Sequence, residues 1–198
     1  MVHFDTHKKL NLNWFMNDVE TEVYESFKKS LNDIGLSPQV VKGNLYNVQK
    51  VHEADVYMSI QLVVSGPVDE LLHGSHNGNI VRSIGVFKIE ILPDLEVPDY
   101  YIFHFSSKRR RADYIIIPSV ELKRRLIARK FIPSSKQVIE LVFWLMPDLC
   151  LYETTDISIE GEWYFMSKGI NGRMSDGKDW DYTQFLNSWE SLNSFLTN

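Results

Sequence analysis

The chain has 198 residues, of which 44% are hydrophobic and 13% aromatic, so it can bury a substantial core, and we expect one domain over residues 1–198. Its net charge of −5 argues against non-specific coating of nucleic acid, which draws on a positive field. The single cysteine excludes an intrachain disulfide and a thiolate metal cluster, and no segment reaches the roughly 18 to 20 apolar residues that cross a bilayer, so we expect a cytoplasmic protein with no membrane partner.

The first part of the chain predicts a helix followed by strands. Apolar residues recur every three or four positions over 17–34, which is typical of an amphipathic helix, and Gly35 suits the end of that helix. Residues 40–51 and 54–65 are rich in Val, Tyr and Ile and predict two strands. Residues 67–79 contain several turn-forming Gly and Asn residues and predict a short helical turn and a loop.

The middle of the chain predicts three strands, over 80–92, 100–105 and 114–117, in an antiparallel meander. Within the second strand, His104 alternates with Phe103 and Phe105, so its side chain should point away from both, toward a polar neighbour. A second helix should begin at a Ser119 cap and run to about residue 131. Its basic residues, Arg125 among them, fall on the predicted solvent side.

The last part of the chain predicts further strands and a closing helix. Residues 138–146 form an apolar run of strand formers, and 150–152 with 157–166 could supply one or two more strands. Residues 182–196 have helical spacing, with Asp181 as a candidate cap. Together these elements predict an α+β fold in which a mixed, largely antiparallel sheet of about six strands is flanked by N-terminal, central and C-terminal helices.

Two segments resemble a known nuclease superfamily. YYIFHF followed by ADYIIIPSVELKRRL is similar to segments of PD-(D/E)XK nucleases in which a strand ending in Pro-Ser leads into a helix. WDYTQFLNSWESL is similar to the tryptophan-containing tail helix of some members. The resemblance implies a restriction-endonuclease-like core and metal-dependent cleavage of phosphodiesters, as in defence, restriction or repair.

The same resemblance implies a catalytic set. Asp55 opens one predicted strand, and Lys88 and Glu90 lie two residues apart on another, where their side chains share a face. Glu20 on the first helix could add a further metal ligand. These carboxylates would hold Mg²⁺, which would polarise the phosphate and lower the pKa of an attacking water.

The catalytic pattern departs from that of the superfamily. Its members have a carboxylate, any residue and then lysine, whereas this chain has Lys88, Ile89 and Glu90 in the reverse order. A rival alignment puts Gln61 at the carboxylate and Val63 at the lysine, and that arrangement could not catalyse. A structural alternative is that Lys88 and Glu90 form a cross-strand ion pair.

Cations gather in the second half of the chain and predict a nucleic-acid-binding surface. Such a surface would combine a cluster in the loop after residue 105 with the second helix and would follow a phosphate backbone. The alternative is a solvated hairpin tip and a solvated helix face. The candidate contacts are Lys108, Arg109, Arg110, Arg111, Lys123 and Arg124.

Two classes of function stay open. The first is a nuclease-like nucleic-acid-binding protein with a metal-dependent phosphodiesterase centre. The second is a non-enzymatic protein-interaction module, such as an immunity or assembly factor, which the acidic total charge favours. Five Trp and nine Tyr residues would also suit a homodimer surface, because aromatic residues concentrate at interfaces.

Overall fold

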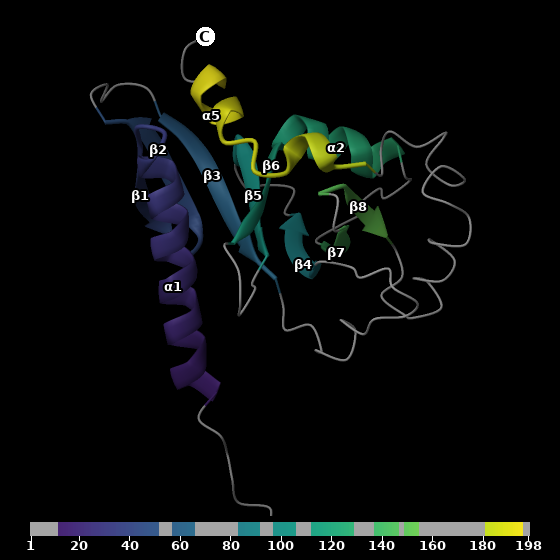
Figure 1. Ribbon diagram of the computed structural model, residues 1–198, viewed down its shortest axis with the longest axis horizontal. Coiled ribbons are helices and arrows are strands. Elements are labelled where there is room, and N and C mark those ends of the chain that lie inside the picture. The colour runs from purple at the N-terminus through teal and green to yellow at the C-terminus, as the bar shows by residue number, and fades with distance from the viewer. Residues whose placement is uncertain are drawn as a thin grey trace, which may run out of the picture.

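The fold is of the predicted α+β class. The computed structural model describes residues 12–51, 57–65, 83–91, 97–105, 112–128, 137–146, 149–154 and 181–195. Figure 1 shows the elements, which are α1 (Leu12–Asn32), β1 (Leu36–Lys42), β2 (Leu45–Lys50), β3 (Tyr57–Val64), β4 (Ser83–Ile91), β5 (Tyr100–Phe105), β6 (Asp113–Pro118), α2 (Ser119–Ala128), β7 (Gln137–Leu145), β8 (Leu151–Thr154), the 3-10 turn η2 (Thr183–Phe185) and α5 (Glu190–Phe195). The predicted loop at 67–79 and strand at 157–166 lie outside the described residues.

The strands form two sheets in the part of the chain described, where one sheet was predicted. A five-stranded sheet has the order β1-β2-β3-β5-β6, and a three-stranded sheet has the order β4-β7-β8. The predicted meander is wrong, because β4 pairs with β7, while β5 lies between β3, to which it is parallel, and β6, to which it is antiparallel. Strands adjacent in sequence pair or neighbour only about two-thirds of the time, so sequence order alone could not settle this.

Two element boundaries differ from the prediction. The first helix begins at Leu12 rather than at residue 17. The predicted strand over 40–51 is a hairpin, in which β1 and β2 are joined at Gly43, whose φ of 54° favours glycine. The turn is not evident in the sequence, because the strand-forming residues valine, before and after it, and tyrosine, after it, suggest one continuous strand.

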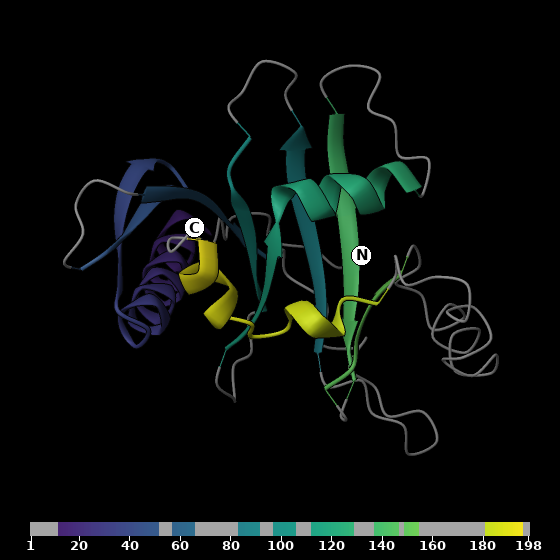
Figure 2. The same ribbon diagram turned by 90° about the horizontal axis from the view of Figure 1, so that it is seen from above.

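Two hydrophobic clusters lie on opposite faces of the five-stranded sheet. On one face, α1 packs Val23, Phe27 and Leu31 against the strands, and α5 adds Leu192. On the other face, α2 and the three-stranded sheet pack against the β5–β6 side, with Phe87 and Phe143 at the centre. Figure 1 shows α1 beside β1 and β2, with β4, β7, β8 and α2 at the opposite end of the sheet. Figure 2 shows α2 crossing the strands of the second sheet.

The edge of the sheet at β1 lacks a central hydrogen-bond donor. Val51 N donates to Gly35 O at 3.1 Å, and alternation along an antiparallel ladder then turns the backbone of Pro38 away from β2. Proline has no N–H, and a register shift between Val40 and Lys42 ends the ladder soon afterwards. Both features discourage pairing with another strand.

We call residues 181–195 the C-terminal segment, and its residues 186–188 cover the opposite edge of the sheet, at β6. Asn187 N donates to Tyr114 O at 2.7 Å, and Tyr114 N donates to Asn187 Oδ1 at 2.9 Å, so one side-chain amide replaces part of a strand. The prediction of one helix over 182–196 is therefore wrong: η2 and α5 are separate, and Asn187 between them has a φ of 51°.

Arg125 connects the C-terminal segment to α2. Its side chain donates from Nε to Glu121 Oε1 at 2.7 Å and from Nη1 to the carbonyl oxygen of Asp181 at 2.6 Å. The guanidinium lies 4.5 Å from the ring centroid of Tyr182 and 5.0 Å from that of Phe185. Arg125 is 2% exposed, so its predicted place among the solvated cations of the helix is wrong.

Within the described ranges, no helix combines the length and the apolar composition needed to cross a membrane.

Candidate functional site

The cation of the predicted catalytic set belongs to an exposed ion pair. Lys88 on β4 is the register partner of Glu140 on β7, and Lys88 Nζ lies 3.6 Å from Glu140 Oε2. The two side chains are 69% and 50% exposed. Lys88 therefore takes part in a cross-strand ion pair with Glu140, whereas the predicted pair with Glu90 stays a prediction, because Glu90 is placed only by the backbone of β4, opposite Val138. Such exposed pairs are typically worth about 0–1 kcal/mol.

The rest of the predicted metal set falls outside the described side chains. Asp55 lies outside the described residues, and Glu20 and Glu90 are placed only by the backbone of α1 and β4. Among the side chains that the structure describes, no three His, Cys, Asp or Glu residues come together in a way that could hold a metal ion. The magnesium site therefore stays a prediction.

On α2, fewer cations are free to form the predicted nucleic-acid-binding surface than the sequence suggested. Arg124 donates to both carboxylate oxygens of Glu121, at 2.7 and 2.9 Å, and Arg125 is buried. The hydrogen bond from Arg124, followed by that from Arg125, lowers the pKa of Glu121 to about 2, so this carboxylate stays ionised and offsets part of the positive charge of the helix. Lys123 is exposed. Residues 108–111 lie outside the described ranges.

His104 points away from the phenylalanines beside it, as predicted, and within the described ranges its side chain has an aromatic neighbour, whereas a polar neighbour was predicted. Phe103 and Phe105 belong to the cluster under α2, whereas His104 packs edge-to-face on Tyr114, with ring centroids 5.1 Å apart. It is 5% exposed, and its Nδ1 has no hydrogen-bond partner in the described structure. Burial lowers the pKa of His104 to about 4.

A polar face of the five-stranded sheet is the strongest candidate for a binding surface. Side chains alternate between the two faces of a strand. In β2 and β3 the even-numbered residues, such as Tyr46 and Ile60, pack under α1, so the odd-numbered residues occupy the opposite face. The second sheet and α2 cover that opposite face at β5 and β6. Over β1, β2 and β3 it carries mainly polar side chains.

The strand register arranges these side chains in rows. Ser37, Gln49 and Tyr57 form one row, and Gln39, Asn47 and Ser59 form the next. A third row runs from Leu45 through Gln61 to Tyr101. We call the polar members of these rows the amide face: Ser37, Gln39, Asn47, Gln49, Tyr57, Ser59, Gln61 and Tyr101.

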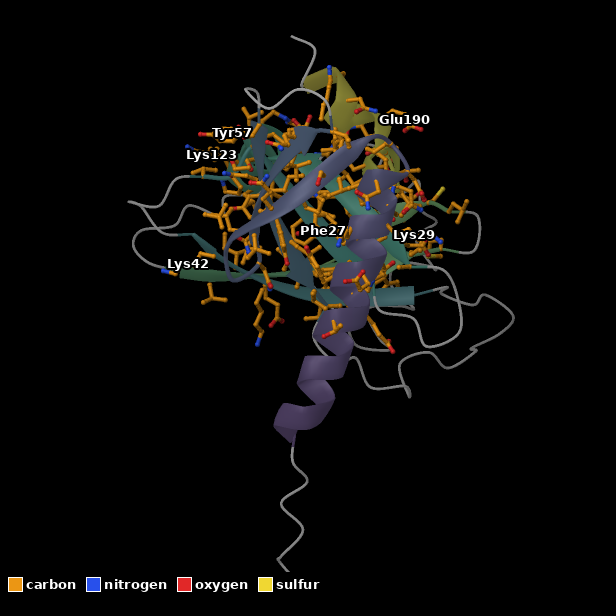
Figure 3. All side chains as sticks on the ribbon, turned by 90° about the vertical axis from the view of Figure 1, so that its left-hand side faces the viewer. Phe27, Lys29, Lys42, Tyr57, Lys123 and Glu190 are labelled. Carbon is orange, nitrogen blue, oxygen red and sulfur yellow. The ribbon has the colours of Figure 1, made fainter. Side chains whose placement is uncertain are left out.

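The amide face is uncharged and accessible. Its eight residues are Ser, Asn, Gln and Tyr, with no Asp, Glu, Lys, Arg or His among them, and burial raises the pKa of Tyr101. Tyr57 is 61% exposed, Gln39 is exposed and the other six are half-buried. Each Asn or Gln side chain offers both hydrogen-bond donors and acceptors. Lys42, at the end of β1, and Tyr57 both lie at the margin of the molecule in Figure 3, away from Phe27 on α1.

Asp99 extends the second row of the face. In the parallel pairing of β3 and β5, Ile60 stands beside Tyr100, so Asp99 lies next to Ser59. Asp99 Oδ2 accepts hydrogen bonds from Ser59 N at 2.7 Å and from Ser59 Oγ at 2.9 Å. In return, Asp99 N donates to Ser59 O at 2.9 Å. These bonds hold a half-buried carboxylate beside the amide face.

The amide face was missed in the sequence, although a signal was present. Asn47 and Gln49 in β2, and Ser59 and Gln61 in β3, place a neutral polar side chain at every second position. This alternation is typical of a strand with one solvated face. The rival alignment gives Gln61 only one role, in the place of a catalytic carboxylate.

No protein-family model, curated protein or solved structure matches this chain.

Proposed function

We propose that this protein is a non-enzymatic protein-interaction module and that the amide face is its docking surface. The observation that carries the proposal is the row arrangement of eight uncharged polar side chains on one face of the sheet. Seven of them lie on β1, β2 and β3, beside the part of that face at β5 and β6 that α2 and the second sheet cover. The strands beneath are anchored by a packed core, so the surface is held rigid before any partner arrives.

The composition of the face suits a protein partner. Tyrosine supplies a large amphipathic contact at low entropy cost, while Ser, Asn and Gln supply adaptable hydrogen bonds, a mixture also found in antibody paratopes. Tyr57, 61% exposed at the end of its row, is of the residue type that is enriched among interface hot spots. Tyr57 is therefore the expected anchor of the interface.

The charge of the face argues against nucleic acid as the occupant. Binding to a phosphate backbone requires cations that release its counterions. The amide face has none, and Lys42 stands at its margin. On α2, Glu121 neutralises part of the basic charge that had favoured nucleic acid.

Two exposed positions allow the face to be changed without disturbing the core. Tyr57→Ala removes the expected anchor, and Gln39→Arg adds a charge to the face. Their matched controls are Val120→Ala, at a 77% exposed position on α2, and Asn32→Arg, at the exposed end of α1. Circular dichroism and urea unfolding establish that each variant is folded before any binding is measured.

The experiment compares partners of the tagged wild type and the four variants. Proteins from the source cells that co-purify with the wild type and both controls, but not with the two face variants, are then produced in pure form. Their affinities are measured by calorimetry, and light scattering shows whether the partner is a second copy of this chain. Weakening of about tenfold or more by Tyr57→Ala, with the controls unchanged, supports the proposal. Equal affinity for all five proteins would overturn it.

The nuclease hypothesis is the competing outcome. Plasmid cleavage with Mg²⁺ or Mn²⁺ is measured for the wild type, Glu90→Ala and Lys88→Ala. Cleavage that both substitutions abolish would replace the interaction module by a metal-dependent phosphodiesterase. No cleavage by the wild type agrees with the present proposal.

A further inference from the structure

We infer that the partner presents a basic side chain, arginine or lysine, to Asp99 at the end of the amide face. The inference rests on the proposed function, since it names the chemistry that the docking protein brings to this surface. Its basis is the position of one carboxylate, its hydrogen bonding, and the lack of an ion-pair partner for it among the described residues.

Asp99 is part of the same surface as the amide face. It is the register neighbour of Ser59, and an odd-numbered position before β5 places it on the side of Tyr101 and Phe103 rather than under α1. The row that begins at Gln39 therefore ends at a carboxylate. A partner that covers Ser59 would also reach Asp99.

The hydrogen bonds of Asp99 use only one of its two oxygens. A carboxylate has about four acceptor sites. Both side-chain hydrogen bonds, from Ser59 N and from Ser59 Oγ, go to Oδ2. In the described structure Oδ1 accepts no hydrogen bond, so one oxygen of a fixed carboxylate stays available to a donor from outside.

Neither of the two donors neutralises the charge. The backbone N–H and the hydroxyl of Ser59 are uncharged, and no ion pair joins Asp99 to a cation among the described residues. Lys42 lies three strand spacings away, roughly 14 Å. The charge of Asp99 acts on its neighbour: burial, and then the charge of Asp99, raises the pKa of Tyr100.

Docking makes this charge decisive for the choice of partner. A partner that covers the half-buried Asp99 removes water from it, and a neutral partner would leave the carboxylate dehydrated without compensation. A partner with an arginine or lysine at that point would form a pre-oriented, charge-assisted hydrogen bond with Oδ1. The amide face then provides adaptable contacts, and Asp99 provides selectivity against neutral or acidic partners.

The first test uses single amino acids as probes. Acetyl-arginine amide, acetyl-lysine amide and the uncharged acetyl-norleucine amide are titrated into ¹⁵N-labelled full-length protein, and backbone amide shifts are followed by NMR. We expect saturable shifts at Ser59 and Asp99 with a cationic probe and none with norleucine. The Asp99→Asn variant keeps acceptor oxygen for Ser59 and should lose these shifts, whereas Glu25→Gln, at an exposed acid on α1, should keep them.

Equal shifts in the wild type and in Asp99→Asn would overturn the inference, as would equal responses to arginine, lysine and norleucine. A second measurement separates this failure from that of the proposed function. With the purified partner, Asp99→Asn should weaken binding about tenfold or more. If Tyr57→Ala weakens binding and Asp99→Asn does not, the docking surface stands and the inference about Asp99 falls. If neither substitution weakens binding, both fall.

Discussion

Replacing His104 by phenylalanine should remove a pH-dependent part of the stability. The imidazole is 5% exposed and packs edge-to-face on Tyr114, and phenylalanine can retain that ring contact. Burial lowers the pKa of His104 from 6.5 to about 4. The folded protein therefore keeps this side chain neutral at pH values where the unfolded chain protonates it.

The sign and size follow from proton linkage. The unfolded state binds more protons between pH 6.5 and about 4, so the contribution of His104 is complete above pH 6.5 and is lost as the pH falls toward 4. The full difference corresponds to about 3 kcal/mol, of which about 2 kcal/mol is already lost at about pH 5. Glu121, whose pKa is lowered from 4.5 to about 2, loses its contribution only at lower pH.

The assay is urea unfolding of the wild type and His104→Phe, followed by tryptophan fluorescence at about pH 7.5 and about pH 5. Histidines elsewhere in the chain affect both proteins alike, so the difference between their pH responses isolates His104. The wild type should lose about 2 kcal/mol more than the variant between the two pH values. An equal loss in both proteins would refute the assignment of a depressed pKa to this buried imidazole.

Three further substitutions test the packing. Arg125→Met should lower the free energy of unfolding by about 2–4 kcal/mol, because it removes a buried guanidinium held by Glu121 and two aromatic rings. The control Lys123→Met should change the free energy of unfolding by less than about 0.5 kcal/mol. Similar losses in both variants would contradict a stabilising role of the contacts that Arg125 makes. Gly85→Ala should lower the urea midpoint, at a cost of about 1–3 kcal/mol, because a Cβ there would lie 2.7 Å from the ring of Phe105, and an unchanged midpoint would show that the rings can move. Pro38→Val restores a donor at the free edge of β1 and should raise the mass measured by light scattering with increasing concentration; a mass that matches the wild type at every concentration would mean that the register shift alone protects the edge.

Most of the secondary structure could be predicted from local sequence patterns. The spacing of Val23, Phe27 and Leu31 predicted the helix whose inner face these residues form. The strand over 100–105 and the helix that begins at Ser119 also match the structure at those boundaries. These elements depend on neighbours within a few residues, which a sequence pattern records directly.

Long-range pairings could not be predicted in the same way. The partner of Lys88 lies on β7, and nothing near Lys88 in the sequence indicates Glu140. Arg125 looked like a solvated cation because its burial depends on rings more than 50 residues away, beside Asp181. The break in the last helix has the same origin, since Asn187 bonds to the edge of β6.

The candidate site likewise has one part that the sequence indicates locally and another that depends on long-range strand pairing. The alternation of neutral polar residues in β2 and β3 is local and was available in the sequence, whereas the place of Asp99 in a row with Ser59 depends on the parallel pairing of β3 and β5. Asp55 and the cluster at 108–111 stay predictions, because they lie outside the described residues.

The cover over β6 has a consequence for biosynthesis. Tyr114 and the asparagine that satisfies its backbone are 73 residues apart. At about 5–20 residues per second, a ribosome needs roughly 4–15 s to reach Asn187 after it has added Tyr114. Hairpins form within about 1–10 μs, so β5 and β6 can pair long before their neighbour exists. During synthesis the edge of β6 therefore stays unpaired for seconds. We expect chaperone binding or aggregation at this edge to compete with completion of the fold.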